Sequence, residues 1–194
     1  PMTDAPLRSE DELFEYFHAS EKPREAWRIG AEAEKFGVNA ATGAPLAYDG
    51  PNGVVRVLAA LVEAHGWQPE SETPGGPIIS LRREQASITL EPGAQLELSG
   101  SPLDDVHWIC AEMRGHMAEL RAISSEMNLA WLGIGFHPLA RLADLPWVPK
   151  QRYRIMKRYL PTRGPRAEDM MRRTATLQAN LDYSGGEDAM RKVR

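Results

Sequence analysis

Hydrophobic and polar residues alternate along several short segments of the chain, which predicts β-strands with one polar face. In residues 27–36 the apolar side chains alternate with polar ones, so a strand there places Glu32 and Glu34 on the same face. Residues 77–82 and 86–91 are two β-rich runs separated by a short polar stretch. Such a pair predicts an antiparallel hairpin.

The same alternation returns in later segments, and it again gives each predicted strand a polar side. It runs through residues 86–91, resumes after the Pro92-Gly93 interruption, and appears once more in residues 173–183. The polar positions of these strands carry the following candidate side chains: Glu91, Gln95, Glu97, Gln178 and Asn180.

Apolar stripes with a period near 3.6 residues predict helices between these strands. A capping box at Ser9 predicts a short first helix, and residues 53–65 predict a second one that Gly66 ends. The longest stripe begins after Ser101 and continues to Met127. The spacing that follows Ser184 predicts the start of one more helix.

The order of these elements predicts an α+β fold, in which helices cover one face of an antiparallel β-sheet. Residues 131–136 predict a further, buried strand, and residues 138–149 a long ordered loop. At 194 residues with 42% hydrophobic content, residues 1–194 are expected to form a single domain.

Charge and cysteine content narrow the function classes. The net charge of −4 and the pI near 5.8 lack the basic excess that favours nucleic acid or anionic membranes as partners. Cys110 is the only cysteine, so we expect a small buried hydrophobic residue there and neither a disulfide within the chain nor a thiolate cluster. With no apolar run of membrane-spanning length, these features favour the cytoplasm.

The polar strand faces suggest a chemistry based on oxygen ligands. Glu32, Glu34, Glu91 and Glu97 occupy the same kind of face, and carboxylates are the ligands that hard divalent cations prefer. Crowded carboxylates are costly unless a cation compensates them. The alternative is that each acidic face is the solvated side of a sheet.

Other polar residues are open to two interpretations. His137 follows the predicted buried strand and is either a hydrogen-bonded loop residue or a contact to metal or substrate. The basic cluster in residues 150–158 is either an exposed helix face or a binding site for anionic groups. Because the chain has no glycine-rich phosphate loop, a nucleotide site in it would have to use metals and arginines.

Five segments resemble successive signature blocks of the plant and proteobacterial type of glutamate–cysteine ligase. They occur in the same order as in that family, with similar separations. The segments are RIGAEAEKFG (28–37), ITLEPGAQLELSGSPL (88–103), LGIGFHP (132–138), VPKQRYRIMKRYLP (148–161) and DMMRRTATLQANLDYS (169–184).

The resemblance implies a fold similar to glutamine synthetase, with the metal-bound glutamates on the inner face of an antiparallel sheet. It implies that Mg²⁺ is the cofactor and that ATP, glutamate and cysteine are the substrates. By this resemblance Glu32, Glu34 and Glu97 are magnesium ligands with Glu91 close by, and Arg152 binds a substrate carboxylate or phosphate. Two further groups are implied as substrate contacts, Gln95 beside the metal ligands and the pair Gln178 and Asn180 on the last strand.

Members of that family are considerably longer than this chain, so the residues here correspond to the N-terminal portion of the catalytic domain. We therefore expect the 194-residue chain alone to be inactive. Two other functions stay open at this point: a related γ-glutamyl ligase that uses another amine acceptor, and a non-catalytic remnant that binds metal or a partner.

Overall fold

The computed structural model describes residue 6 and residues 8–194 of the chain. Six α-helices and three short 3-10 helices are present in this part: α1 Glu10–His18, η1 Arg24–Ala26, α2 Val54–His65, α3 Val106–Met127, η2 Leu142–Asp144, α4 Gln151–Tyr159, η3 Leu160–Thr162, α5 Ala167–Arg173 and α6 Gly186–Val193. The strands are β1 Ile29–Asn39, β2 Gln68–Glu70, β3 Ser80–Arg83, β4 Ala86–Leu90, β5 Leu96–Ser99, β6 Leu129–Leu132 and β7 Leu177–Leu181.

All seven strands form one antiparallel sheet in the order β2-β3-β4-β5-β1-β6, and β7 also pairs with β1. The long strand β1 is central because its first part pairs with β7 and its last part with β6. The predicted hairpin is confirmed: β3 and β4 join through Glu84 and Gln85, and Glu84 has a positive φ of 53°. The predicted antiparallel sheet with helices is therefore present.

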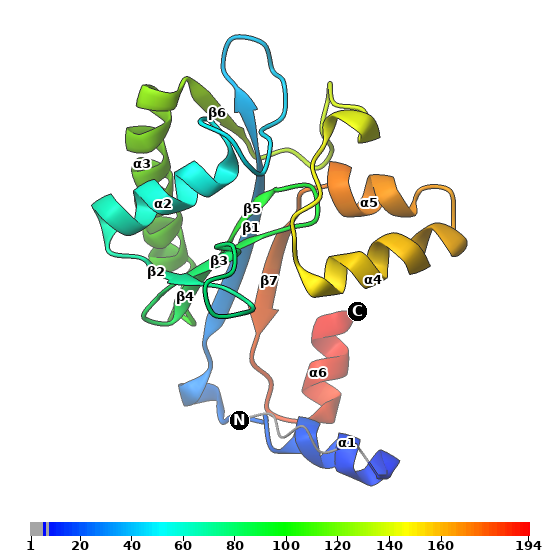
Figure 1. Ribbon diagram of the computed structural model, residues 1–194. Coiled ribbons are helices and arrows are strands. Elements are labelled where there is room, and N and C mark those ends of the chain that lie inside the picture. The colour runs from blue at the N-terminus through cyan, green and yellow to red at the C-terminus, as the bar shows by residue number, and fades with distance from the viewer. Residues whose placement is uncertain (1–5, 7) are drawn as a thin grey trace.

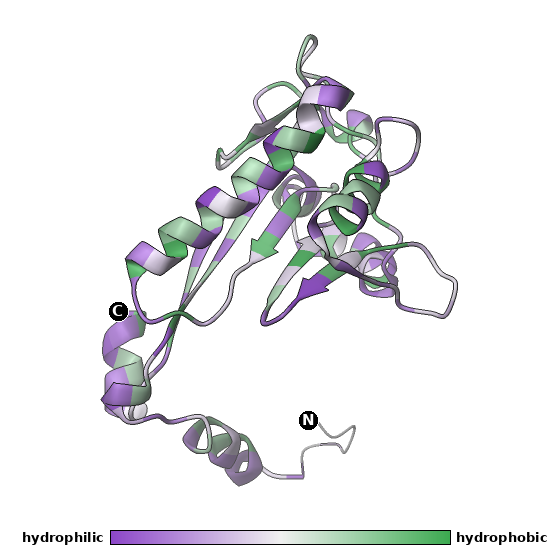
Figure 2. Ribbon diagram, turned by 90° about the vertical axis from the view of Figure 1, so that its left-hand side faces the viewer, coloured by the Kyte–Doolittle hydropathy of each residue, from purple (hydrophilic) through white to green (hydrophobic). Residues whose placement is uncertain are grey.

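The apolar face of the sheet packs against α2 and α3 (Figures 1 and 2). Side chains that are at most 1% exposed fill this layer: Val57, Leu58 and Leu61 from α2, Leu120 from α3, and Leu81, Ile88, Leu90 and Leu96 from the strands. Their burial removes apolar surface from water, which is the main force that holds the helices on the sheet.

Helices lie on both sides of the sheet, so the prediction of helices on one face only is wrong. Figure 1 shows α4 and α5 on the side opposite to α2 and α3. The buried ring of Tyr153 anchors α4 there, because its hydroxyl donates to the carbonyl oxygen of Leu90 at 2.8 Å. This contact places the neighbouring residues Lys150 and Arg152 close to the polar side chains of the sheet.

The longest predicted helix is confirmed as α3, and its two ends have clear causes. The Asp105 side chain accepts hydrogen bonds from the backbone N–H groups of His107 and Trp108, which satisfies free donors at the helix start. Asn128 ends the helix in the left-handed conformation, at φ 54°. Neither α3 nor any other described helix is long and apolar enough to cross a membrane.

Two predictions about burial are wrong. Residues 131–136 do not form a buried strand, since β6 ends at Leu132 and the side chains of Ile134 and Phe136 are exposed. Cys110 is exposed as well. It follows the buried Ile109 by one residue on α3, and one residue turns a helix by about 100°, away from the core.

The first and last helices lie side by side at one end of the molecule (Figure 1). The backbone N–H of Lys22 donates to the carbonyl oxygen of Tyr183 at 2.9 Å, and the Lys22 ammonium pairs with Asp182. The predicted Ser9 cap is confirmed on α1, where its hydroxyl accepts from the backbone N–H of Glu12. At the predicted last helix, Gly185 holds the capping position and Ser184 precedes it.

Candidate functional site

A polar hollow of about 380 Å³ opens on the face of the sheet that α2 and α3 leave uncovered. We call it the acidic hollow, and define it by the residues that line it: Glu32, Glu34, Thr89, Glu91, Glu97, Ser99, Lys150, Arg152 and Gln178. Four strands or strand ends and one helix contribute to it, so segments far apart in the sequence converge there.

The register of the sheet explains why these side chains share a face. Glu34 is opposite Glu97 across β1 and β5, and Glu97 is opposite Thr89 across β5 and β4. On the other edge of β1, Glu32 is opposite Gln178. Residues directly opposite in antiparallel strands point to the same side, so the alternation within each strand becomes one continuous polar surface.

Hydrogen bonds of 3.0 Å or less hold three of the four glutamates in place, and the Tyr153 hydroxyl donates to the fourth, Glu91, at 3.5 Å. The Thr89 hydroxyl donates to Glu97 at 2.7 Å, and the Asn180 amide donates to Glu32 at 2.9 Å. The backbone N–H and hydroxyl of Thr176 donate to Glu34 at 2.9 and 3.0 Å. The carboxylates are therefore fixed on a rigid sheet rather than on mobile loops.

Two carboxyl groups of the acidic hollow, those of Glu34 and Glu97, hold protons more tightly than free ones. The pKa of Glu97 is raised to about 7, mainly by burial; the neighbouring Glu32 and Glu91 add to the rise, and the hydrogen bond from Thr89 opposes it. Burial also raises the pKa of Glu34, with smaller contributions from Glu91 and Glu32. Such crowding is relieved when a cation binds between the carboxylates.

Two cations from α4 and its start border the acidic hollow. The Lys150 ammonium donates to the carbonyl oxygen of Leu90 at 2.8 Å, and burial lowers its pKa. The Arg152 guanidinium lies 5.1 Å from the centre of the Tyr153 ring. Within residues 8–194, Arg152 forms no salt bridge. Its donors face solvent beside the glutamates, where an anionic ligand can reach them.

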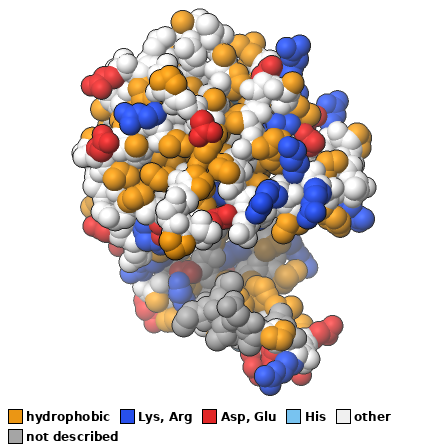
Figure 3. Space-filling view, viewed as in Figure 1, with side chains coloured by type: hydrophobic (Ala, Val, Ile, Leu, Met, Phe, Trp, Pro, Cys, Tyr) orange, Lys and Arg blue, Asp and Glu red, His pale blue; other side chains and the backbone are white. Residues whose placement is uncertain are grey.

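The basic cluster of residues 150–158 extends this positive region over the outer surface of α4. Arg154, Lys157 and Arg158 are exposed there, and Figure 3 shows lysine and arginine side chains gathered over the part of the surface that α4 and α5 form. The structure thus fits the exposed-face interpretation for most of the cluster, whereas Lys150 and Arg152 turn to the acidic hollow.

Gln95 lies outside the acidic hollow, which does not fit a direct substrate contact. Its side chain is 1% exposed and donates to the carbonyl oxygens of Met171 and Thr174, while it accepts from the backbone N–H of Gly93. The residue precedes β5 in a turn where Ala94 has a positive φ of 65°. Gln95 thus lies on the same side of the sheet as Glu97, in keeping with the alternation, but the end of α5 covers it there (Figure 1).

His137 is buried away from the acidic hollow, in agreement with its interpretation as a hydrogen-bonded residue. Its Nδ1 accepts from the backbone N–H of Ala140 at 3.0 Å, and its ring packs against Phe36 with centres 4.8 Å apart. Burial lowers its pKa, so the ring is neutral at physiological pH. No contact joins it to the predicted metal ligands.

Three residues of the site were not singled out as site candidates from the sequence. Thr89 and Ser99 sit at polar positions of the same alternating strands, so the period of two could have indicated them. Lys150 belongs to the basic cluster of residues 150–158, but it was not identified as a candidate site residue from the sequence. Its role depends on the docking of α4 onto the end of β4, which no local pattern reveals.

The donor set fits a hard divalent cation, although the side chains do not form a closed metal cage. No three histidine, cysteine, aspartate or glutamate side chains among the described residues are arranged to hold one ion. Mg²⁺ is commonly bound by only one or two carboxylates together with water and substrate phosphates. The four glutamates and the raised pKa values of two of them are consistent with such an open site.

Comparison with known proteins gives one family. The sequence model described as glutamate-cysteine ligase family 2 (GCS2) matches residues 28–194, which include every residue of the acidic hollow.

Curated plant proteins are similar over nearly the whole chain. Glutamate–cysteine ligase B, chloroplastic, of Oryza sativa subsp. japonica is 44% identical over 193 residues, which cover 100% of this chain and 38% of the rice protein. The chloroplastic glutamate–cysteine ligases of Brassica juncea and Arabidopsis thaliana are each 43% identical over 189 residues, or 97% of this chain, and the match covers 36% and 35% of their lengths. The chain thus spans little more than a third of the length of these relatives, and their chloroplast names leave its cytoplasmic location a prediction.

Proposed function

The chain belongs to glutamate-cysteine ligase family 2, and we propose that it forms the glutamate-lined part of an active site that joins the γ-carboxylate of glutamate to the amine of cysteine. This ligation consumes ATP, depends on Mg²⁺ and is the first step of glutathione biosynthesis. The observation that carries the proposal is the convergence of four glutamates and Arg152 in the acidic hollow. The names of the plant relatives support the same reaction.

Glu32, Glu34 and Glu97, with Glu91 at the end of β4, are the side chains that would hold Mg²⁺. Their oxygens suit a hard cation, and a bound cation offsets the burial and the like-charge repulsion that together raise the pKa values of Glu34 and Glu97. When bound, Mg²⁺ neutralises charge on the phosphate oxygens of ATP.

Arg152 and Lys150 would bind the anionic groups that the glutamates repel. The Arg152 guanidinium has a planar fork of donors that fits a carboxylate or a phosphate, and both cations border the acidic hollow. Gln178 lies across from Glu32 on β7, and Asn180 donates to Glu32. These two amides would orient polar groups of the substrate next to the metal ligands.

The proposed reaction needs no nucleophile from the protein. An oxygen of the γ-carboxylate attacks the terminal phosphorus of ATP and releases ADP, and the amine of cysteine then attacks the acyl carbon and releases phosphate. The acidic hollow contains no cysteine or histidine, and the exposed Cys110 belongs to α3 on the other side of the sheet. The chain's residues would position the reactants and balance their charges.

We further propose that residues 1–194 are the N-terminal part of a catalytic domain with a glutamine synthetase-like fold. The plant relatives have additional length that this chain does not match. We therefore expect the 194-residue chain alone to lack ligase activity, and a version extended to the length of its relatives to have it.

The test is to measure ADP and phosphate release with ATP, Mg²⁺, glutamate and cysteine for both versions. Turnover by the extended protein that disappears with Glu97→Gln and persists with Glu63→Gln, an exposed glutamate on α2, is the expected result. A ligase whose activity is unaffected by Glu97→Gln would contradict the assigned site.

Two other functions are separated by the same assay. A γ-glutamyl ligase with a different acceptor would release phosphate faster with another amine than with cysteine. A non-catalytic remnant would stay inactive with every amine after extension. The preference for cysteine rests on the names of the relatives, since the acidic hollow carries no group that distinguishes one amine from another.

A further inference from the structure

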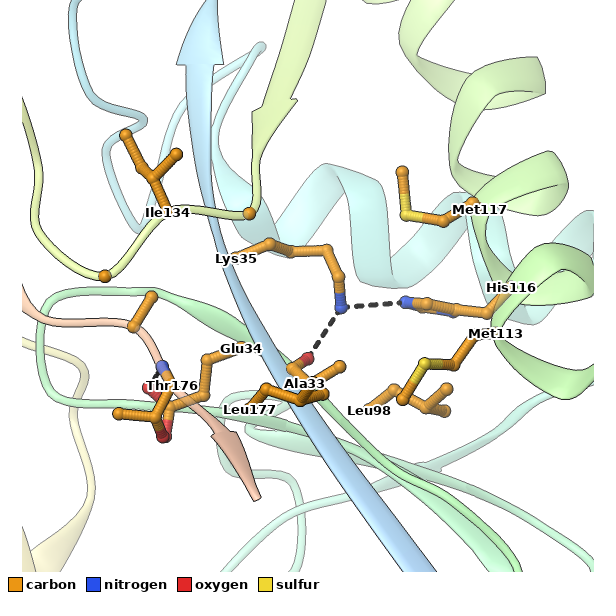
Figure 4. Close-up of a pocket in the computed structure, with 13 residues that line it drawn as sticks. Ala33, Glu34, Lys35, Leu98, Met113, His116, Met117, Ile134, Thr176 and Leu177 are labelled. Carbon is orange, nitrogen blue, oxygen red and sulfur yellow. Dashed lines mark hydrogen bonds between the residues drawn. The ribbon is translucent and has the colours of Figure 1, made fainter. Parts of the chain in front are cut away.

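A second hollow, of about 630 Å³, lies on the opposite face of β1 from the acidic hollow. We call it the Lys35 hollow. Figure 4 shows Lys35 pointing from β1 toward His116 on α3, with Met113 and Met117 beside them and Ile134 at the other side. Most of the lining is apolar, and it includes Leu98 and Leu177 from the neighbouring strands.

Lys35 is a buried cation at the base of this hollow. The residue is 6% exposed. Its ammonium donates to the carbonyl oxygen of Ala33 at 2.7 Å and lies 3.4 Å from Nε2 of His116. An ammonium has three donors, so these two contacts leave one without a partner. Lys35 forms no salt bridge within the described part of the chain.

His116 supports the ammonium without neutralising it. The ring is 3% exposed, and burial together with the charges of Lys35 and Arg83 lowers its pKa to about 3. The neutral ring can therefore accept a hydrogen bond from the Lys35 ammonium at Nε2, which leaves the N–H of the ring at Nδ1. That Nδ1 atom is buried and has no partner among the described residues.

The carboxylates nearest to Lys35 point away from it. Glu34 and Glu97 act on its charge, but the Glu34 carboxylate, which borders both hollows, is held by Thr176, and the Glu97 carboxylate is held by Thr89 in the acidic hollow. Two acids of α3 lie within about one turn of His116: Glu112 accepts from the backbone N–H of Ser101, and Glu119 is paired with Arg83 and accepts from Trp67. A buried charge without a partner is costly. The described residues provide no anion that pairs with the Lys35 ammonium in this hollow.

We propose that the Lys35 hollow is a binding site for a carboxylate carried on an apolar body. The carboxylate accepts the free donor of Lys35, and the apolar body packs against Met113, Met117 and Ile134. The volume lies within the usual range for small-ligand sites. A planar monoanion with an aliphatic tail matches one buried cation in an apolar wall better than a phosphate, which needs several donors.

The carboxylate has two possible sources. One is a free aliphatic acid, and the other is an acidic side chain from the additional length that the relatives possess. Both sources use the same contact with Lys35, and the experiment has one part for each. The proposal is independent of the ligase function, because the acidic hollow and the Lys35 hollow share only Glu34 between their linings.

The first part titrates the 194-residue chain, labelled with ¹³C at its methionine methyl groups, with butyrate. The methyl signals of Met113 and Met117 should shift to saturation, while that of Met190, which lies away from this hollow, should stay in place. Butanol, which has the same body without the charge, should bind at least about tenfold more weakly.

Two pairs of variants test the contact. Lys35→Met keeps the length of the side chain and should abolish the butyrate shifts, whereas Lys157→Met on exposed α4 should leave them unchanged. Because Ile134 is 41% exposed at the rim, Ile134→Glu should fold normally and should block butyrate by placing a carboxylate of the chain beside Lys35. Ile134→Gln should still bind it.

The second part repeats the titration on a protein extended to the length of its relatives. Saturable shifts that depend on Lys35 would identify a free acid as the ligand. If the extended protein does not bind butyrate and Lys35→Met destabilises it, an acidic side chain from the additional length is the partner of Lys35. The proposal is overturned if butyrate and butanol shift the methyl signals equally in the 194-residue chain, or if Lys35→Met binds butyrate as well as the unchanged chain does.

Discussion

At the scale of single residues, Glu97 determines how the acidic hollow responds to pH. It is 7% exposed, lies opposite Glu34 and accepts from Thr89. Its pKa of about 7 lies above the ordinary value of 4.5. The folded chain therefore holds this proton more tightly than the unfolded chain, and the free energy of unfolding falls as the pH rises between these two values.

Glu97→Gln should consequently stabilise the metal-free chain at high pH. Below about pH 4.5 the carboxyl group is protonated in both states, so the variant should unfold at nearly the same temperature as the unchanged chain. Near pH 8 the unchanged chain carries a buried charge that the variant lacks, and the variant should unfold roughly 3–6 °C higher. Thermal unfolding followed by circular dichroism at both pH values checks this; a gain of the same size at both would contradict the assigned pKa.

Near pH 8, Mg²⁺ should give the unchanged chain a higher unfolding temperature than Glu97→Gln. A cation that binds the folded state raises the unfolding temperature by mass action, and its binding requires Glu97 to lose its proton. We expect Mg²⁺ to stabilise the unchanged chain more at high pH than at low pH. Glu97→Gln and Glu34→Gln should each weaken the Mg²⁺ affinity by on the order of tenfold. Glu63→Gln is the control, and equal affinities for all four proteins would argue against a metal site here.

At the scale of elements, the start of α3 depends on one side chain. Asp105 accepts from two backbone N–H groups of the first turn, at 2.7 and 3.2 Å. Asp105→Ala should therefore lower the free energy of unfolding by about 1 kcal/mol. Asp105→Asn keeps the acceptor oxygen and should retain most of the stability. Chemical denaturation of the three proteins measures the difference, and an equal loss for both variants would show that charge rather than capping matters.

The turn before β5 depends on the absence of a side chain at Gly93. A Cβ there would lie 2.6 Å from the carbonyl oxygen of Arg172 and 2.9 Å from the side-chain oxygen of Gln95. Gly93→Ala should separate this turn from α5 and displace Glu91, the residue that follows β4. We expect a lower unfolding temperature and a weaker response to Mg²⁺, measured in the same thermal assay. Gly115→Ala on α3, where a Cβ meets nothing within 4 Å, is the matched control.

Local patterns were sufficient for the elements but not for their arrangement. The alternation in β1 and β5 predicted Glu32, Glu34 and Glu97 on polar faces, because a strand has a fixed period of two. The same rule gave no sign that the end of α5 covers Gln95, which donates to the carbonyl oxygens of Met171 and Thr174. The position of Arg152 relative to the glutamates depends on Tyr153 docking onto Leu90 across 63 residues of sequence. Such long-range contacts leave no periodic signal, and the resemblance to a family supplied what the pattern could not.

At the scale of the whole molecule, β1 separates two different environments. Its polar side faces the acidic hollow through Glu32 and Glu34, and the next residue, Lys35, faces the opposite hollow. A strand that alternates between the two sides couples them mechanically, because a shift in its register would move both at once. The two hollows are nevertheless chemically distinct: one gathers four carboxylates, and the other holds a buried lysine in an apolar wall.

Strand β7 also influences how the isolated chain behaves at high concentration. It pairs with β1 on one edge, and its other edge has no strand partner within the described residues. Leu177 and Leu181 are 73% and 49% exposed on it. An open, apolar strand edge is a template for sheet-to-sheet association between molecules, so purified material should tend to aggregate as it is concentrated. A lysine in place of Leu177 would be a practical first step toward samples that stay monodisperse.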